Sequence, residues 1–527
     1  QVEAAAWAIV LNPSPPTPNK FVDLIDILDG MDEAQKKLLS ETLKSWAITA
    51  SSDDLVPVSR ALRQAGYSPE REIETGVVQQ IQPRDIVARH QWLFAEHYVP
   101  ESRAELMNEK FDYEAREKWI GDRRDKAAAE VFAELGINGI IKLLMGGNAN
   151  YPVGRHLANS LDDTEAVDSI ESLIRHRDEE NKLRFRSAIA GLLFKNGDDG
   201  LSQLAVAATQ RFSKDSDGWE EHCLEIFLAC PFLPSVWDIL ETDFSTIEDR
   251  YWRLVVPNVW RFKSDEYDRM IDRMLRAKRP RAAFAAVRHS TKEVDPFTLA
   301  RLLESMISGG DESSDEYRID RYSIDQSLAY LHDKKALTVD EMARLEFVFV
   351  DSLSHSKHGT PNLNRRNAAN PGAFVELVAL LYKRKDGAED PEQYRLSPDS
   401  DSKAVFHNVY KVLDQLSLTP GTTEEGEISV EKLIAWVRSV QKQLRELSRE
   451  EIGDQQIGKL LGRCPSGADG IWPHEAVRIA LEEIGNEEIL RGMSLAVYNS
   501  RGVVWRGPGG DQERTLAAKY EGWAKAV

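Results

Sequence analysis

Cysteine is scarce in this chain. Its 527 residues include three cysteines, Cys223, Cys230 and Cys464. An odd, small number of widely spaced cysteines cannot form a disulfide framework for a chain of this length. Sparse cysteine is typical of a reducing compartment, so we expect a cytoplasmic protein. Cys223 and Cys230 lie in one apolar stretch and are expected to be small buried side chains rather than metal ligands.

Long apolar runs and positive charge are also lacking. A membrane-spanning helix needs roughly 18 or more consecutive apolar residues, and charged residues interrupt every candidate stretch. The sequence therefore predicts no membrane span. Acidic residues number 87 and basic residues 67, which gives a formal net charge of -20. Because phosphate neutralisation dominates nucleic-acid affinity, this balance disfavours a general DNA or RNA binder.

The first residues carry no charged segment before an apolar core, so no signal peptide is predicted. Residues 12–19, NPSPPTPN, are rich in proline and typical of a stiff linker. We interpret residues 1–20 as a linker from an upstream segment that would precede Gln1.

What the chain has is helical periodicity over most of its length. In residues 123–147, apolar side chains recur at three- and four-residue spacing on two stretches that Gly136 separates and Gly146 closes. Glycine is the preferred residue just past a helix C-terminus, so this segment predicts a helical hairpin. Looser versions recur to residue 307, at roughly 30 to 45 residues per unit. The pattern predicts an all-α protein, an α-solenoid of HEAT- or TPR-like hairpins.

The length predicts more than one body, because single cores stop growing near about 250–300 residues. An acidic break at 308–318 and a loop at 417–428 interrupt the helical pattern. Strand signals are few, and the strongest, FVFVDSL at 347–353, is equally compatible with a helix. We predict an N-terminal helical-repeat domain at 21–310, a second helical block at 311–420 and a C-terminal helical capping block at 421–527.

One segment, from Gly453 to Lys459, has the glycine and lysine spacing of a phosphate-binding loop. That loop needs a preceding strand and a Ser or Thr after the lysine to hold magnesium. Here Leu460 follows, and the upstream residues have a helical pattern. We interpret the segment as a junction between helices, and no cofactor is expected.

Arg84 and His90 match a loose pattern of helical ribonucleases, in which the arginine holds a phosphate and the histidine acts on the 2′-hydroxyl. A pattern of two residues matches readily by chance. The segment 84–97 also has the pattern of an ordinary helix. His90 could therefore equally face a core or a partner.

Asp351, His355 and His358 are spaced so that two or three could share a helical face, as some metal ligands do. The run is polar and ends in Gly-Thr-Pro, which favours an exposed loop. The pair His474-Glu475 lacks the second histidine of the zinc-protease pattern. We predict no metal site and no catalytic residue.

Arginines beside aromatic residues are the better binding signal, at 251–261, 278–281, 365–366 and 501–506. If several converged on the concave wall of a solenoid, they could bind phosphate, RNA or an acidic peptide. The acidic balance favours the alternative, that each arginine pairs with a nearby carboxylate. The predicted partner-binding residues are Trp252, Arg253, Trp260, Arg279, Arg281, Trp505 and Arg506.

Several segments resemble a known family. They are YWRLV (251–255), RPRAAF (279–284), ARLEFVFVDSL (343–353), NPGAFVELVALLYK (370–383), GDQQIGKLL (453–461), IWPHEAVRIALEE (471–483) and YNSRGVVWRGPGGDQERTLAAKYEGWA (498–524). Over roughly residues 80 to 527, these words are similar to the C-terminal region of large bacterial HigA-like helix-turn-helix antidote or transcriptional-regulator proteins. The resemblance implies a bacterial cytoplasmic protein linked to toxin–antitoxin or phage-defence loci.

The resemblance transfers no DNA-binding or catalytic residue. Residues 20–75 lack a short-turn helix pair with a basic second helix, so DNA binding is not implied. The sequence predicts a non-enzymatic helical-repeat scaffold or sensor region that binds a protein partner or a ligand. The alternative is a nucleic-acid-directed effector, ribonuclease-like, that uses Arg84 and His90. A third reading is a sensor arm of an upstream switch or DNA-binding module.

Overall fold

A computed structural model describes residues 17–64, 77, 80–99, 112–214, 216–259, 262–308, 317, 320–354, 356–396, 402–499 and 509–526. Over these residues the chain is helical and has no β-strand, and Thr422 and Ile428 form an isolated antiparallel bridge. The all-α prediction is confirmed. Residues 347–353, which carry the strand-like pattern, fall in two short helices.

The chain divides into two compact units, Gln1–Asn258 and Val259–Val527. Their boundary lies inside the predicted domain at 21–310. The predicted boundary at 420/421 does not separate two cores, because Leu416 and Ile428 belong to the same buried cluster as Leu433 and Trp436. The loop between the helices contributes apolar side chains to that cluster, so the blocks on either side of it fold together.

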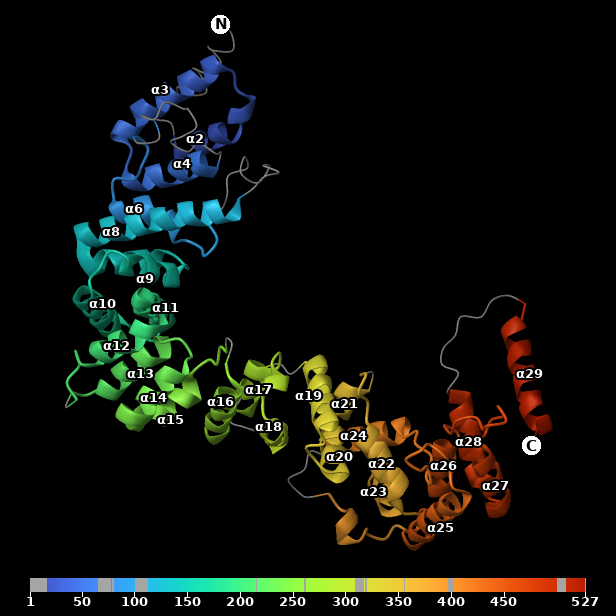
Figure 1. The fold of residues 1–527 in the computed structure, drawn as a ribbon. Helices are drawn as coiled ribbons and strands as arrows, with labels where there is room; N and C mark the ends of the chain where they lie inside the picture. The colour runs from blue at the N-terminus through green and yellow to red at the C-terminus, as the bar shows by residue number, and fades with distance from the viewer. Residues whose placement is uncertain are drawn as a thin grey trace. The chain divides into compact units, whose positions relative to one another are not determined.

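The first unit is a succession of helices (Figure 1). They are α2 (Pro18–Asp26), α3 (Glu33–Thr49), α4 (Ser52–Gln64), α6 (Ile86–His90), α8 (Tyr113–Gly146), α9 (Asn150–Ala158), α10 (Asp163–His176), α11 (Lys182–Leu193), α12 (Gly197–Thr209), α13 (Trp219–Ala229), α14 (Pro234–Asp243) and α15 (Ser245–Leu254). Short 3-10 turns lie at Leu28–Gly30, Gln91–Leu93 and Phe194–Asn196.

The second unit continues in the same manner (Figure 1). Its helices are α16 (Ser264–Arg276), α17 (Pro280–Val287), α18 (Pro296–Ser308), α19 (Arg321–Lys334), α20 (Val339–Val348), α21 (Val350–Leu353), α22 (Pro361–Ala369), α23 (Pro371–Leu381), α24 (Ser402–Gln415), α25 (Val430–Glu446), α26 (Glu450–Leu461), α27 (Glu475–Ile484), α28 (Glu487–Asn499) and α29 (Asp511–Ala526). Short 3-10 turns lie at Thr291–Glu293 and Glu392–Tyr394.

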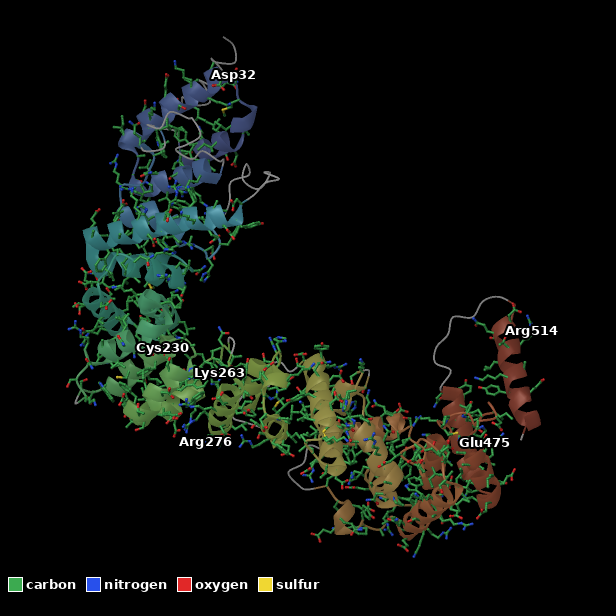
Figure 2. All side chains as sticks on the ribbon, viewed as in Figure 1. Asp32, Cys230, Lys263, Arg276, Glu475 and Arg514 are labelled. Carbon is green, nitrogen blue, oxygen red and sulfur yellow. The ribbon has the colours of Figure 1, made fainter. Side chains whose placement is uncertain are left out.

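Local sequence signals set several helix boundaries. Asp32, labelled in Figure 2, starts α3 with a capping box in which its carboxylate accepts from the Gln35 backbone N–H. Proline opens α17 and α18, where its missing N–H removes no helical hydrogen bond. Gly136 has φ 61° and kinks α8 at the point where the sequence predicts a break. The predicted hairpin at 123–147 is therefore present as two segments of one kinked helix.

Helices in each unit pack on close neighbours in the chain. In the first unit α9 packs on α11, α11 on α13 and α13 on α15, with α10 and α12 on each other. In the second unit α23 packs on α25, α25 on α27 and α26 on α28. Arg186 of α11 donates Nε and Nη2 to the buried carboxylate of Glu225 on α13, at 2.9–3.0 Å. Each of these helices therefore packs mainly on helices that are one or two elements away in the chain.

One close helix contact recurs in both units. A β-carbon on Gly154 of α9 would overlap the Ala188 carbonyl of α11, and one on Gly191 would overlap the Tyr151 carbonyl. In the second unit the α26–α28 pair repeats this arrangement. There, Gly458 faces the Ile489 carbonyl and Gly492 faces the Gln455 carbonyl. The two pairs share one geometry. Each glycine lies against a backbone carbonyl on the other helix, and that carbonyl belongs to the residue three positions before the other glycine. The two backbones are therefore in contact.

The buried core of each unit is apolar and also encloses the cysteines. Cys223, Cys230 and Cys464 are all buried and unbridged. The predicted burial of Cys223 and Cys230 is confirmed. Cys230, labelled in Figure 2, ends α13, and burial raises the pKa of its thiol to about 12. Among the described helices, none is both long and apolar enough to cross a membrane.

Candidate functional site

Trp252 lies in the core of the first unit. Its side chain is 2% exposed, and its ring centroid is 5.3 Å from that of Trp237, 5.5 Å from Tyr251 and 5.9 Å from Phe232. Edge and tilted contacts at these distances are the favourable geometries for aromatic pairs. The ring joins α14 to α15 and could reach a partner only if this core opened, which differs from its predicted place on a binding surface.

Arg253 directly follows that cluster and is exposed. Leu254 and Val256, beside it at the end of α15, are 53% and 70% exposed. Val255, between them, is buried. The end of α15 therefore presents two aliphatic side chains and one arginine on a support of packed aromatic rings.

Arg279 and Arg281 belong to the second unit. Arg279 is buried, and its Nη2 donates to the Tyr317 hydroxyl at 3.0 Å, while Arg281 is half-buried. Of the predicted partner-binding residues, Trp260, Trp505 and Arg506 lie outside the described residues. Whether these side chains bind a partner stays a prediction, and the burial of Arg279 places it in the packing of its own unit.

Arg84 holds a helix end. Its Nη2 donates to the Ile48 carbonyl at 2.8 Å and to the Ala47 carbonyl at 3.3 Å, at the C-terminus of α3. A cation at that end satisfies carbonyls that lack helical partners and complements the helix dipole. Asp85, the next residue, caps the N-terminus of α6. Arg84 therefore joins two helices, which is a structural role.

His90 also has a packing partner. Its Nε2 lies 2.9 Å from the Glu130 carboxylate on α8. Burial lowers the pKa of His90 below its ordinary value, although Glu130 favours the protonated form. His156 on α9 repeats the arrangement, with Nδ1 2.7 Å from Asp125 and a pKa that burial likewise lowers. The two histidines thus join α6 and α9 to α8, and the ribonuclease alternative stays a prediction that these contacts do not support.

The structure separates Asp351 from His358, and His355 lies outside the described residues. Asp351 is exposed on α21, with Arg321 at 3.3 Å. His358 has a side chain only 5% exposed, and its Nε2 lies 3.3 Å from Glu346. His358 follows α21 in a loop, as expected, but its side chain is buried rather than exposed. Within the described part of the chain, no three His, Cys, Asp or Glu side chains are grouped to hold a metal.

Glu346 of α20 places a buried carboxylate at the N-terminus of α22. It accepts from the Asn362 side chain at 2.6 Å and from the backbone N–H groups of Asn362 and Leu363 at 3.2 and 2.7 Å. Those N–H groups would otherwise lack partners at the helix N-terminus, where negative charge is favoured. Asp325, also buried, accepts from the His358 N–H at 3.0 Å. The buried acids thus fix the loop that precedes α22.

The segment from Gly453 to Lys459 lies inside α26 and forms no phosphate loop. Gly453 packs on the Leu444 side chain, and Gly458 is at the close contact with α28. The glycine spacing is explained by helix packing. The interpretation of this segment as a junction between helices is wrong, because all of it lies within one helix.

Arginines of the remaining basic pair and of a surface hollow form ion pairs. Arg366 lies 3.3 Å from Asp340 and 3.6 Å from Glu376, as the charge-pairing alternative predicts. A hollow of about 500 Å³ lies between α10 and α12, with Gln203 and Arg211 among its lining residues. Arg211 is paired with Asp168 at 2.5 Å.

An exposed surface with aromatic and basic side chains lies on α24, and it is not among the sites predicted from the sequence. Phe406 and Tyr410, one turn apart, are 41% and 56% exposed. His407 and Lys411, on the same side of the helix, lie 3.5 and 3.9 Å from the Asp351 carboxylate, which also binds Arg321. We call Arg321, Asp351, Phe406, His407, Tyr410 and Lys411 the α24 face. The three- and four-residue spacing on α24 could have indicated its aromatic and basic stripes, but not the contributions of α19 and α21.

No protein-family model matches the chain, and no curated protein matches it.

Proposed function

We propose that the chain is a non-enzymatic α-solenoid of HEAT- or TPR-like hairpins that binds a protein partner. Packing of each helix on neighbours close in the chain supports a solenoid, because that is how repeat arrays bury their shared faces. The glycine contact that recurs between α9 and α11 and between α26 and α28 supports a repeated unit. Solenoids leave extended helix faces on which partners bind.

The resemblance to HigA-like bacterial proteins supports a place in the bacterial cytoplasm, in a regulatory, toxin–antitoxin or phage-defence protein. Sparse buried cysteine agrees with that compartment. Architecture alone does not fix function, so the proposal depends on the surfaces.

The observation that carries the proposal is the end of α15. Leu254 and Val256 are among the most exposed aliphatic side chains of the first unit, and Arg253 lies beside them. The buried centre of a protein–protein interface is more apolar than its rim, and arginine is enriched in interfaces, so exposed apolar side chains beside an arginine fit such a surface. Arg84 and His90, the candidates for chemistry in this unit, are instead engaged in holding helices together.

A photo-cross-linking experiment tests the proposal. The photoreactive residue benzoylphenylalanine replaces Val256 in one full-length variant and Leu183 in another, since both side chains are strongly exposed in the first unit. We expect the Val256 position to give a specific cross-linked protein in native cells and the Leu183 position to give none. That protein is then purified and titrated against the wild-type chain and the double variant Arg253→Glu/Leu254→Asp.

Affinity should fall about tenfold or more in the double variant, as for hot-spot residues. If the wild-type chain and the double variant bound the cross-linked protein with equal affinity, the end of α15 would not be the binding surface. Failure of any purified protein to bind would reject the scaffold proposal itself.

A further inference from the structure

The α24 face is built on a well-anchored helix. Val409, Val412 and Leu413 of α24 are buried in the core of the second unit, and Asn408 donates to the Val348 carbonyl of α20. Phe406 and Tyr410 are on the solvent side and, one turn apart, lie next to each other. The aromatic pair is therefore held in a fixed place rather than carried on a loop.

The cations of the face exceed its carboxylates. Arg321, His407 and Lys411 all contact Asp351. One carboxylate is therefore shared by two permanent cations and a histidine. The neighbouring acid on α24, Asp414, lies 3.4 Å from Arg463. In a chain with a net charge of -20, a face with surplus positive charge is a local exception. Opposite charge on a partner would steer it to this face and fix its register.

Aromatic and basic side chains together indicate what kind of partner fits. Two adjacent aromatic side chains offer a large apolar contact at low entropic cost, and arginine and tyrosine are enriched in binding hot spots. Side chains at four-residue spacing, such as Phe406 and Tyr410, form a ridge that packs into the groove between side-chain rows of another helix. Carboxylates flanking that stripe would pair with Lys411 and Arg321.

Nucleic acid is the less suitable partner. Its affinity comes from neutralising several phosphates at once, and here Asp351 lies among the cations and would repel them. The overall charge of the chain would also repel a long polyanion. We infer that the α24 face docks an acidic, amphipathic helical segment of a partner protein. This inference rests on the proposed function, because it names the partner class of the same scaffold.

Peptide selection on the full-length chain tests the inference. A displayed library of helical peptides of about 16 residues, between four and five turns, is selected for binding. We expect the winners to carry net negative charge and apolar residues at i, i+3, i+4 and i+7. The best peptide is then titrated against wild type, Phe406→Ser/Tyr410→Ser and His407→Glu/Lys411→Glu, with Leu490→Ser/Leu495→Ser on α28 as the matched control. A single-stranded oligouridine is titrated in parallel.

Each double change on the α24 face should weaken the peptide about tenfold or more, as hot-spot truncations do, and the α28 control should leave its affinity unchanged. Helical circular dichroism should be the same for all four proteins, because every changed side chain is exposed or partly exposed. Winners without the acidic amphipathic pattern, equal affinity for the face variants, or tighter binding of oligouridine through the same residues would overturn the inference. If the α15 partner still binds wild type in that case, the proposed function stands and only the assignment of this face fails.

Discussion

Buried arginines join the helices of this chain by donating to backbone carbonyls. Arg449 is 1% exposed, and its guanidinium donates to the carbonyls of Ala379, Tyr382 and Leu447 and to both oxygens of Asp390. Arg124 in the first unit reaches the carbonyls of Leu93, Glu96 and His97 in the same way. A guanidinium can satisfy several loop carbonyls at once because its five donors are fixed in a plane.

Replacing Arg449 should therefore be costly. In Arg449→Met, Asp390 loses its partner and three carbonyls lose a donor, so we expect the second unit to lose about 3–5 kcal/mol of stability. The matched control is Arg445→Ala on the same stretch, where the side chain is 72% exposed and pairs with Glu450. That change should cost less than about 0.5 kcal/mol. Urea unfolding, followed by hydrogen exchange in peptides of the second unit, measures both, and similar losses in the two variants would count against this role.

The thiols provide a second test at residue scale. Burial raises the pKa values of Cys223 and Cys230 to about 12, so almost no thiolate forms at pH 8. We expect the native chain to react very slowly with a disulfide reagent such as dithionitrobenzoate, and all three cysteines to react at once in urea. Rapid labelling of Cys230 in the native chain would show that the end of α13 is more open than described.

The sequence alone predicts only some of the burial and contacts of individual residues. The burial of the cysteines follows from their apolar surroundings in the sequence. Trp252 and Arg253 are neighbours in sequence and have opposite burial, because the helix turns one side chain into the aromatic cluster and the other outward. The partners of Arg449 are far away in sequence, so no local pattern could indicate that this arginine, rather than Arg445, is buried.

At the scale of helices, glycine sets how closely two of them approach. Gly458 and Gly492 allow α26 and α28 to touch along their backbones, as Gly154 and Gly191 do for α9 and α11. The sequence shows these glycines but gives a misleading signal at Gly453 and Gly458, where their spacing matches a phosphate loop. A phosphate loop needs a preceding strand, and the helical pattern upstream of Gly453 argues against one. That pattern does not show that the helix continues through the segment, which the sequence interpretation placed at a junction.

We expect Gly458→Ala to destabilise the second unit by about 2 kcal/mol or more, because a methyl group would overlap the Ile489 carbonyl and force the helices apart. Gly522→Ala is the control, since this helical glycine of α29 has open space around its β-carbon position. There the higher helix propensity of alanine should leave stability equal or slightly higher. Thermal unfolding of both variants measures these changes in stability. A neutral Gly458→Ala would mean that the two helices are not in backbone contact.

At the scale of the whole molecule, the first unit contains three histidines whose pKa values burial lowers: His90, His156 and His222. In the unfolded chain the pKa of each histidine returns to about 6.5. Below that pH the unfolded state therefore binds more protons than the folded state. Stability is therefore complete well above pH 6.5 and falls as the pH drops below it. The fall is at most about 1.4 kcal/mol per pH unit for each histidine.

Urea unfolding of the full chain at pH 7.5 and 5.5, followed in peptides of the first unit, measures this dependence. The first unit should be less stable at pH 5.5, and His156→Gln should reduce the difference because glutamine keeps a donor for Asp125 without titrating. A first unit that is more stable at pH 5.5 would indicate that the ion pairs with Asp125 and Glu130 outweigh burial.

Whole-molecule organisation was the least predictable level. The helical class follows from periodicity, but the division at Asn258 and Val259 coincides neither with the acidic break at 308–318 nor with the loop at 417–428. The core of the second unit includes side chains from both sides of the loop at 417–428, since Leu416 and Ile428 are buried with Trp436. The α24 face likewise combines Arg321, Asp351 and Lys411 from three helices, which only the fold brings together.

The central claim is that this chain acts by binding a protein on exposed helix surfaces that its packed interior keeps in place. Hydrogen exchange of the full-length chain, with and without the partner identified by cross-linking, tests that claim most directly. We expect slower exchange at the end of α15 or along α24 and unchanged exchange in α9, α11, α26 and α28, where the close backbone contacts already protect the amides. Unchanged exchange at both surfaces, or protection centred on Arg84 and His90, would contradict it.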